Sequence, residues 1–368
     1  MSNTLLTPSI IAKESIMVLQ NNLVMAGLVH RDFSNEFAKV GDTVTVRKPA
    51  TFVSNVWNGT TVTIQNATEG SVPVVMDTIL DVSFAAGSKE MALSINDFSE
   101  QFIQPAMRAH AQALDAKLAG LYEDIPYATA VGSTADIADI AAIDTIMNNN
   151  MVPLDQRSLV LNPATKSKYI VLPGISNAEK SGSTDALRKA SLGEILGFST
   201  FMSQNVKAHT KGTLGTAKVK TGVAAGAAAG TLYNSSLTGT LKKGDVFTVA
   251  GDTQQYVCLA LATAGSNEVD ITFYPAAKVA WDGDAAVTVL ASASAENLAF
   301  HKNCFALVTR PLEKPMGAAY AETLSFNGVS CRIVAGYDMN TKQDTISIDF
   351  LCGVKTLTPE LGVRFRTA

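Results

Sequence analysis

The sequence has little charge and few cysteines, and it contains no long apolar run. Charged residues make up 17% of the 368 positions, hydrophobic residues make up 47%, and the formal net charge is -4. Lysine and arginine occur in scattered pairs, such as Arg47-Lys48 and Lys242-Lys243, which we interpret as solvated turns. The composition excludes a disordered chain and a dedicated nucleic-acid binder, which would carry a basic face. A chain with so few charges favours a surface that is partly covered by partners.

Cysteine and targeting signals are equally sparse. The four cysteines Cys258, Cys304, Cys331 and Cys352 lie far apart, and no C-x-x-C motif occurs, which argues against a zinc or redox site. The pattern predicts buried thiols in a reduced cytosolic protein. The N-terminal segment has no basic region followed by an apolar run, so we expect no signal peptide. No apolar stretch reaches the ~20 residues that span a bilayer, so we expect no membrane partner.

Signals for catalysis are also missing, since the chain has no G-x-S-x-G, H-E-x-x-H or Walker A motif. The one suggestive pair is His301 and Cys304, within residues 297–317. Alternation in this stretch predicts a single strand that sends the two side chains to opposite faces. They would then not form a nucleophile and its base, and we expect no catalytic, cofactor-binding or metal-binding residues. An enzyme that uses Cys304 and a distant histidine is the least favoured alternative.

The N-terminal third contains extended, strongly apolar elements. Thr7-Pro8 predicts the start of a helix over residues 9–29, which docks either on its own core or on a neighbouring chain. After a turn at Gly41-Asp42, the chain up to residue 84 is rich in Val and Thr and is broken by Asn58-Gly59 and Glu69-Gly70. This pattern predicts a long hairpin with arms of about twenty residues. Such a hairpin has too little covering to form a core, so we expect it to pack against another subunit.

One long helix is predicted over residues 94–125. Ile103, Met107 and Leu114 recur at helical spacing, and Ser94 with Asp97 resembles a capping box. Pro105 should kink this helix or lie near its true start. At 1.5 Å per residue the helix would be about 40 Å long, which is typical of a structural spine.

The rest of the chain predicts a mixed α/β domain with an inserted β domain. A helix capped by Ser133 with Asp136 is expected over 133–153, followed by a strand at 158–163, a helix after it and a strand at 197–206. Between 207 and 296 helix signals vanish and evenly spaced strands predict a small barrel or sandwich, with 223–232 as a flexible linker or turn. Further strands over 297–310 and beyond 329 predict an antiparallel sheet.

Several stretches together resemble a known family. They are LLTPSIIAKESIMVLQNNLVMAGLVHRDF, KVGDTVTVRKP, VSFAAGSKEMALSINDFSEQFIQPA, SLVLNPATKSKYIV, GFSTFMSQNV, NLAFHKNCFALVTRPLEKPMGA and DFLCGVKTLTPELGVR. Their order and spacing are similar to those of the major capsid (coat) proteins of short-tailed double-stranded-DNA bacteriophages. The resemblance runs nearly end to end and is weakest in the inserted β domain.

The resemblance implies an α+β chain with the Hong Kong-type capsid fold of tailed phages and an inserted all-β, barrel-like domain. The implied parts are an N-arm (1–39), an E-loop (40–84), a P domain with the spine helix (85–126), an A domain (127–206 and 297–328), the inserted domain (207–296) and P-domain strands (329–368). Shell expansion would hinge near Pro105 or Gly87.

The implied function is structural. Copies would assemble into hexamers and pentamers of an icosahedral shell that encloses packaged double-stranded DNA without reading its sequence. A scaffolding protein and a portal protein would be partners, and the protein would be found in the virion capsid after assembly in the host bacterial cytoplasm. The alternative is the shell protein of a bacterial nanocompartment of the same fold.

Overall fold

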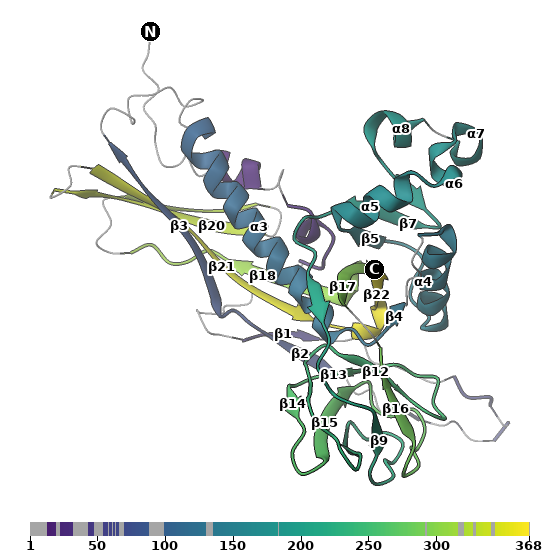
Figure 1. Cartoon of the computed structure of the whole chain (residues 1–368). Coiled ribbons are helices and arrows are strands. Elements are labelled where there is room, and N and C mark those ends of the chain that lie inside the picture. Colours follow the sequence, from purple (N-terminus) through teal and green to yellow (C-terminus); the bar gives the residue numbers. More distant parts are fainter. Residues whose placement is uncertain are drawn as a thin grey trace. The chain divides into compact units, whose positions relative to one another are not determined.

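A computed structural model gives the fold of most of the chain (Figure 1). It describes residues 13–19, 23–31, 43–47, 54–57, 59–60, 62, 64–65, 70–87, 99–129, 135–182, 184–290, 293–315, 320–326, 329–339 and 343–367. The expectations for Thr7-Pro8, Gly41-Asp42, Ser94 with Asp97, and Ser133 therefore fall outside the described residues. The chain divides into two compact units, one of 1–22, 31–111 and 306–357, the other of 23–30, 112–305 and 358–368.

The first unit is built on an antiparallel sheet. Its strands are β18 (Phe305–Arg310), β21 (Gln343–Thr356), β20 (Val329–Asp338) and β19 (Tyr320–Phe326) in that order, and β3 (Thr78–Gly87) also pairs with β21. Alternation along β21 buries Ile346, Ile348 and Phe350 on one face. The ring of His110, from helix α3, lies 4.8 Å from the Phe350 ring, and its Nε2 lies 3.0 Å from the Ile348 carbonyl. The helix therefore covers the apolar face of this sheet.

Helix α3 (Gln104–Gly120) is the expected spine, in a shorter form. A π-helical turn, η2 (Ser99–Ile103), precedes it and a 3-10 turn, η3 (Leu121–Asp124), follows it. Met107, Leu114 and Leu118 are buried, which confirms the predicted apolar face. Pro105 is the second residue of α3, where the π-helical turn passes into the α-helix, so it lies near the start of α3.

The second unit contains a seven-stranded sheet. The order is β4 (Ala128–Thr129), β22 (Gly362–Thr367), β17 (Ala293–His301), β5 (Arg157–Leu161), β7 (Phe198–Met202) and β6 (Glu194–Ile195), while β8 (Ala208–Thr210) also pairs with β17. Strand β22 pairs antiparallel with β17 and parallel with β4, and its Val363 and Phe365 belong to the apolar core of this sheet.

Short helices accompany the sheet. They are α4 (Ile137–Asn149), α5 (Pro163–Ile170), α6 (Pro173–Ser176), α7 (Ala178–Ser181) and α8 (Asp185–Lys189). Asp136 caps α4 in a capping box with Asp139, so the N-cap lies three residues beyond the predicted Ser133. Asn162 caps α5 and accepts a hydrogen bond from the Thr165 amide at 2.7 Å. Strand β5 is buried throughout, as its apolar run predicts.

A closed barrel is inserted between β8 and β17. Its strands are β9 (Ala217–Val219), β10 (Ala229–Tyr233), β12 (Val246–Val249), β13 (Tyr256–Cys258), β15 (Glu268–Tyr274) and β16 (Ala286–Val289), with a separate pair of β11 (Thr240–Leu241) and β14 (Ala262–Thr263). Phe273 stacks on Trp281 at 4.7 Å in its core. Of the two alternatives for residues 223–232, the flexible linker is wrong, because Val223 and Leu232 are buried in this core and residues 229–233 form β10. The turn is present at residues 225–226.

Candidate assembly surfaces

The stretch around His301 and Cys304 is not the single strand that its alternation predicts. Strand β17 ends at His301, a 3-10 turn, η4 (Lys302–Cys304), follows, and β18 begins at Phe305. The cause is local, since Nδ1 of His301 accepts a hydrogen bond from the Asn303 amide at 3.2 Å and so caps the turn. Burial raises the pKa of the Cys304 thiol well above its usual range. The thiol therefore stays protonated, which makes it a poor nucleophile.

The described residues contain the base of the predicted hairpin. Strands β1 (Thr43–Arg47) and β2 (Ser71–Val75) pair antiparallel over five residues each. Val44 and Val74 bury the base of the hairpin in an apolar cluster with Val308 and Leu351. The base is therefore anchored in the first unit.

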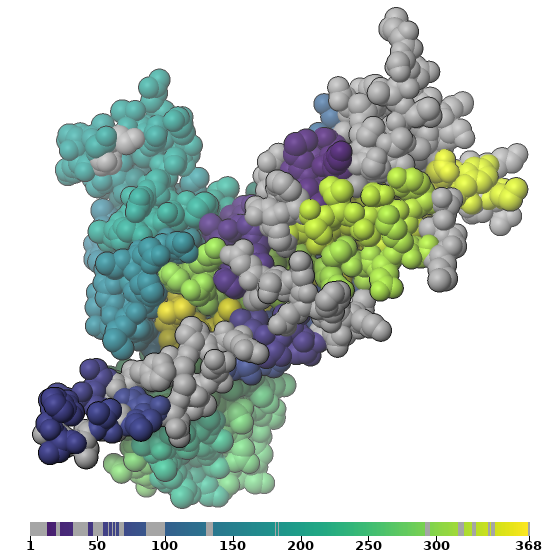
Figure 2. Space-filling model, turned by 180° about the vertical axis from the view of Figure 1, so that it is seen from behind, coloured from purple at the N-terminus to yellow at the C-terminus, as the bar shows by residue number. Residues whose placement is uncertain are grey.

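The described part of the hairpin tip is exposed and apolar. The side chains of Val56, Trp57, Val62 and Ile64 are 98%, 68%, 78% and 88% exposed. The described residues of this segment, blue-violet in Figure 2, lie on the molecular surface. Gly59 has a φ of +85°, as expected for the glycine of an Asn-Gly turn. A group of large apolar side chains this exposed is typical of a surface that a partner covers.

The N-terminal segment docks on its own chain where the structure describes it. The backbone amides of Val24, Met25 and Ala26 donate to the Asp115 carboxylate of α3 at 3.0, 3.1 and 3.3 Å, and this fixes the turn η1 (Met25–Gly27). Burial raises the pKa of Asp115, and these amide hydrogen bonds only partly oppose the rise. Of the two alternatives left open by the sequence, docking on the chain's own core applies to residues 23–30.

A buried polar cluster joins the barrel to the sheet of the second unit. The Asp245 carboxylate accepts hydrogen bonds from His209 Nε2 at 2.8 Å and from the backbone amides of Gly212 and Lys242 at 2.9 and 2.7 Å. His209 Nδ1 in turn lies 3.0 Å from the Tyr122 hydroxyl. The chain of contacts runs from the end of the spine, through the strand that enters the barrel, into the barrel itself.

Arg364 of β22 reinforces this joint. Its guanidinium is fully buried, donates to the Gly244 and Glu123 carbonyls at 2.6 and 3.3 Å, and lies 5.3 Å from the centre of the Tyr122 ring. Burial lowers the pKa of Arg364 to about 10. Gly244 has a φ of +89°, and a Cβ there would lie 3.2 Å from the Glu123 side chain, so glycine is required at this close approach.

Lys242 and Lys243 are exposed at a turn, as the sequence predicts. Lys243 Nζ also lies 3.2 Å from carboxylate oxygens of both Glu123 and Asp124 in the turn η3. The Lys242 amide is one of the donors to Asp245. No sequence signal reveals the joint, because its members lie far apart in the chain and Gly244-Asp245 resembles any tight turn.

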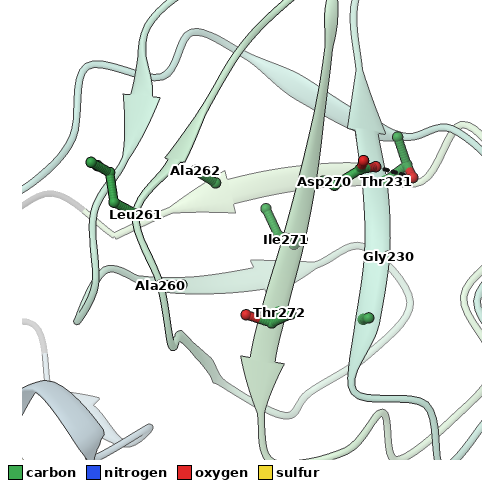
Figure 3. A pocket seen from close by; sticks show the side chains of 9 residues that line it. Gly230, Thr231, Ala260, Leu261, Ala262, Asp270, Ile271 and Thr272 are labelled. Carbon is green, nitrogen blue, oxygen red and sulfur yellow. Dashed lines mark hydrogen bonds between the residues drawn. The ribbon is translucent and has the colours of Figure 1, made fainter.

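A shallow groove opens on the barrel between β15 and the segment before β14 (Figure 3). Its lining is small and mostly apolar: Ala229, Gly230, Thr231, Ala260, Leu261, Ala262, Asp270, Ile271 and Thr272. The acid of the groove, Asp270, accepts a hydrogen bond from the Thr231 hydroxyl at 2.6 Å. These lining residues include no histidine, cysteine or lysine.

The described part of the chain contains no group of three or more His, Cys, Asp or Glu residues that could hold a metal ion. None of its helices has the length and apolarity needed to cross a membrane.

Comparison with known proteins gives both family and fold. The profile of the family described as P22 coat protein, gene protein 5, matches residues 2–253. Comparison with curated proteins gives no match. Among solved structures, one from Mycobacterium phage Che8 is similar with a TM-score of 0.52 at 15% identity, covering 93% of this chain and 90% of that chain.

Two other solved structures are also similar. The capsid of Ralstonia phage GP4 has a TM-score of 0.49 at 12% identity, covering 92% of this chain and 87% of that chain. The capsid of Cyanophage P-SCSP1u has a TM-score of 0.45 at 12% identity, covering 95% of this chain and 98% of that chain.

The fold, with its hairpin, spine helix and inserted barrel, is that of the major capsid proteins of tailed phages. These are structural proteins that build a shell. Within that class the chain belongs to the P22 coat protein family, whose profile spans more than half of its length.

Proposed function

We propose that copies of this chain assemble into hexamers and pentamers of an icosahedral shell around packaged double-stranded DNA. The observation that carries the proposal is the hairpin tip, where Val56, Trp57, Val62 and Ile64 are exposed on a hairpin whose base is buried. The exposed apolar tip does not stabilise a monomer. A neighbouring copy that covers the tip removes its apolar surface from water and so stabilises the assembly.

The proposal keeps the parts that the sequence implies. An N-arm (1–39), an E-loop (40–84) and an inserted domain (207–296) would accompany the P domain (85–126 and 329–368) and the A domain (127–206 and 297–328). A scaffolding protein and a portal protein would assist assembly in the host bacterial cytoplasm. The mildly acidic chain, with a formal charge of -4, suits contact with DNA that must be packed and released without sequence recognition.

A hairpin variant tests the proposal. Trp57→Ser combined with Ile64→Ser should leave the subunit folded, because both side chains are exposed, but should greatly reduce the yield of closed shells on negative-stain micrographs. Leu261→Ser on the barrel is the matched control, since this leucine is also exposed and lies outside the hairpin. Deletion of residues 54–68 should have the same effect as the double substitution.

Normal shells from the hairpin variants would remove the role that we assign to the tip. The contents of wild-type shells then distinguish a phage capsid from a bacterial nanocompartment. Co-purified double-stranded DNA from infected cells supports a phage capsid, whereas protein cargo without DNA would support the nanocompartment alternative. The match to a phage coat protein family favours the capsid.

A further inference from the structure

One part of the chain is rich in lysine and contains no acid. Residues 195–244 include no aspartate or glutamate, although the whole chain has a formal net charge of -4. The lysines of this part are Lys207, Lys211, Lys218, Lys220, Lys242 and Lys243. A local excess of one charge within a chain of the opposite sign indicates contact with an oppositely charged partner.

Half of these lysines lack an acidic partner. The other half, which includes Lys243, lies within 3.9 Å of carboxylate oxygens from other segments. Lys207, Lys211 and Lys242 are exposed and form no ion pair among the described residues. We call these three residues the lysine row. Their charges are available to a partner.

The fold brings two members of the lysine row together. The backbone amides of Gly212 and Lys242 donate to the same oxygen of Asp245, at 2.9 and 2.7 Å. Lys242 Nζ also donates to the carbonyl oxygen of Thr210, the residue before Lys211, at 3.3 Å. Two segments that are far apart in the sequence therefore present their lysines at one place.

Lys207 extends the lysine row along β8. This strand spans Ala208–Thr210, so Lys207 and Lys211 flank it on its two sides. At 3.3 Å per residue of extended chain, their Cα atoms are about 13 Å apart. Duplex DNA carries one negative charge per ~1.7 Å of helix axis, so about eight phosphates fall within this span. Each lysine of the row can thus meet a different phosphate.

The nearest acids do not cancel the charge of the lysine row. The Asp245 side chain is fully buried and is already bound within the polar cluster. Glu123 and Asp124 share Lys243, and Arg364 donates to the Glu123 carbonyl beneath them. The lysine row therefore keeps its positive charge.

We infer that the lysine row binds the phosphate backbone of duplex DNA and makes no contact with the bases. Lysine meets phosphate as a point charge, and such contacts carry no sequence information. The residues between the lysines, Ala208 and Thr210, are exposed and small, so the row lacks the large apolar side chains that form the centre of a protein interface.

The inference rests on the proposed function, since it names a surface through which a shell subunit contacts DNA. Three phosphate contacts give weak binding that salt readily reverses. Such binding suits DNA that must be packed and later released.

The salt dependence of DNA binding tests the inference. Lys207→Gln, Lys211→Gln and Lys242→Gln are combined in one full-length variant. Fluorescence anisotropy of a labelled DNA duplex gives the binding constant of unassembled subunits at several salt concentrations. The slope of log K against log salt should be less steep than that of the wild type by about 2.7, because each phosphate contact contributes about 0.9.

A variant with the same loss of charge serves as the control. Lys166→Gln, Lys180→Gln and Arg188→Gln change residues of α5, α7 and α8 that also form no ion pair among the described residues. These helices lie away from the barrel strands in Figure 1. The control should keep the wild-type slope, and circular dichroism should show that both variants are folded.

The other outcomes each have a definite meaning. Wild-type subunits that do not bind the duplex, an unchanged slope in the lysine-row variant, or an equal loss in the control would overturn the inference. Displacement of the duplex by poly-glutamate of equal charge would also overturn it and assign the lysine row to an acidic protein. These outcomes leave the proposed function intact, because closed shells are scored separately on micrographs. A wild-type chain that never forms closed shells would remove the proposed function, while a less steep slope would still show the DNA contact.

Discussion

Replacement of Asp245 by Asn should remove much of the stabilisation that comes from the polar cluster between the barrel and the sheet of the second unit. The carboxylate is fully buried and accepts three hydrogen bonds, from His209 and from the amides of Gly212 and Lys242. Asn keeps one acceptor oxygen, so its amide nitrogen must face a donor. A hydrogen bond to a charged group contributes about 1.5–3 kcal/mol, and a buried donor without an acceptor costs about 1–3 kcal/mol. We expect the free energy of unfolding to fall by about 2–4 kcal/mol.

Urea unfolding of unassembled subunits measures this loss. The chain has two tryptophans, and Trp281 is buried in the barrel, so in a Trp57→Phe background its fluorescence reports on the barrel. Asp270→Asn is the matched control, because Asp270 is exposed and accepts a bond from Thr231. The control should change the free energy of unfolding by less than about 0.5 kcal/mol.

The loss of stability caused by Asp245→Asn should become smaller at acidic pH. Burial raises the pKa of Asp245, but the hydrogen bonds from His209, Lys242 and Gly212 outweigh it and leave the pKa below its usual value. A lowered folded-state pKa means that the stabilisation is complete above the unfolded pKa of about 3.9 and is lost as the pH falls through the folded value. The difference between wild type and Asp245→Asn should therefore shrink below about pH 4. A difference under about 0.5 kcal/mol at pH 7, or one that stays constant into acid, would refute the reasoning.

Three other changes have defined outcomes. Arg157→Lys should lower the free energy of unfolding by about 3 kcal/mol, because Lys cannot reach the Asp144 carboxylate and the Pro153 carbonyl together. An unchanged melting temperature would contradict this. Asp115→Ala should cost about 2 kcal/mol and accelerate amide hydrogen exchange in the first turn, since three amides lose their acceptor. Excision of the segment between Thr210 and Ala293, with a short glycine linker, should leave a soluble core with its sheet signal in circular dichroism, because these two residues pair directly; insoluble product would show that barrel and core fold as one.

Local physics made part of the fold predictable. The buried face of α3, with Met107 and Leu114, follows from helical spacing, and the alternation of β21 follows from strand periodicity. The hairpin base was predictable because Val and Thr alternate up to an Asn-Gly turn. The cap of α4 was misplaced by one turn, since two aspartates at the right spacing also satisfy the pattern.

Long-range contacts made the rest unpredictable. Arg364 reaches a carbonyl 120 residues away, and no local pattern signals such a partner. Residues 229–233 have weak strand propensity, but a closed barrel offers hydrogen-bond partners on both sides. There Gly230 allows the Val223 side chain to approach to 3.0 Å from where a Cβ would lie. The exposure of Met151 could not be predicted from the sequence either, because it depends on which residues the fold places around this side chain.

The position of β22 in its sheet has a consequence for synthesis on the ribosome. This strand lies between β4 and β17, so both must wait for residues 362–367 to emerge before they gain their neighbour. The barrel draws all its strands from residues 217–289 and can close earlier during translation. A chain cut short before β22 would leave the sheet divided and Val363 and Phe365 missing from its core. Only subunits in which β22 has been translated would then be able to enter a shell. Chains that end before this strand would be left out of assembly.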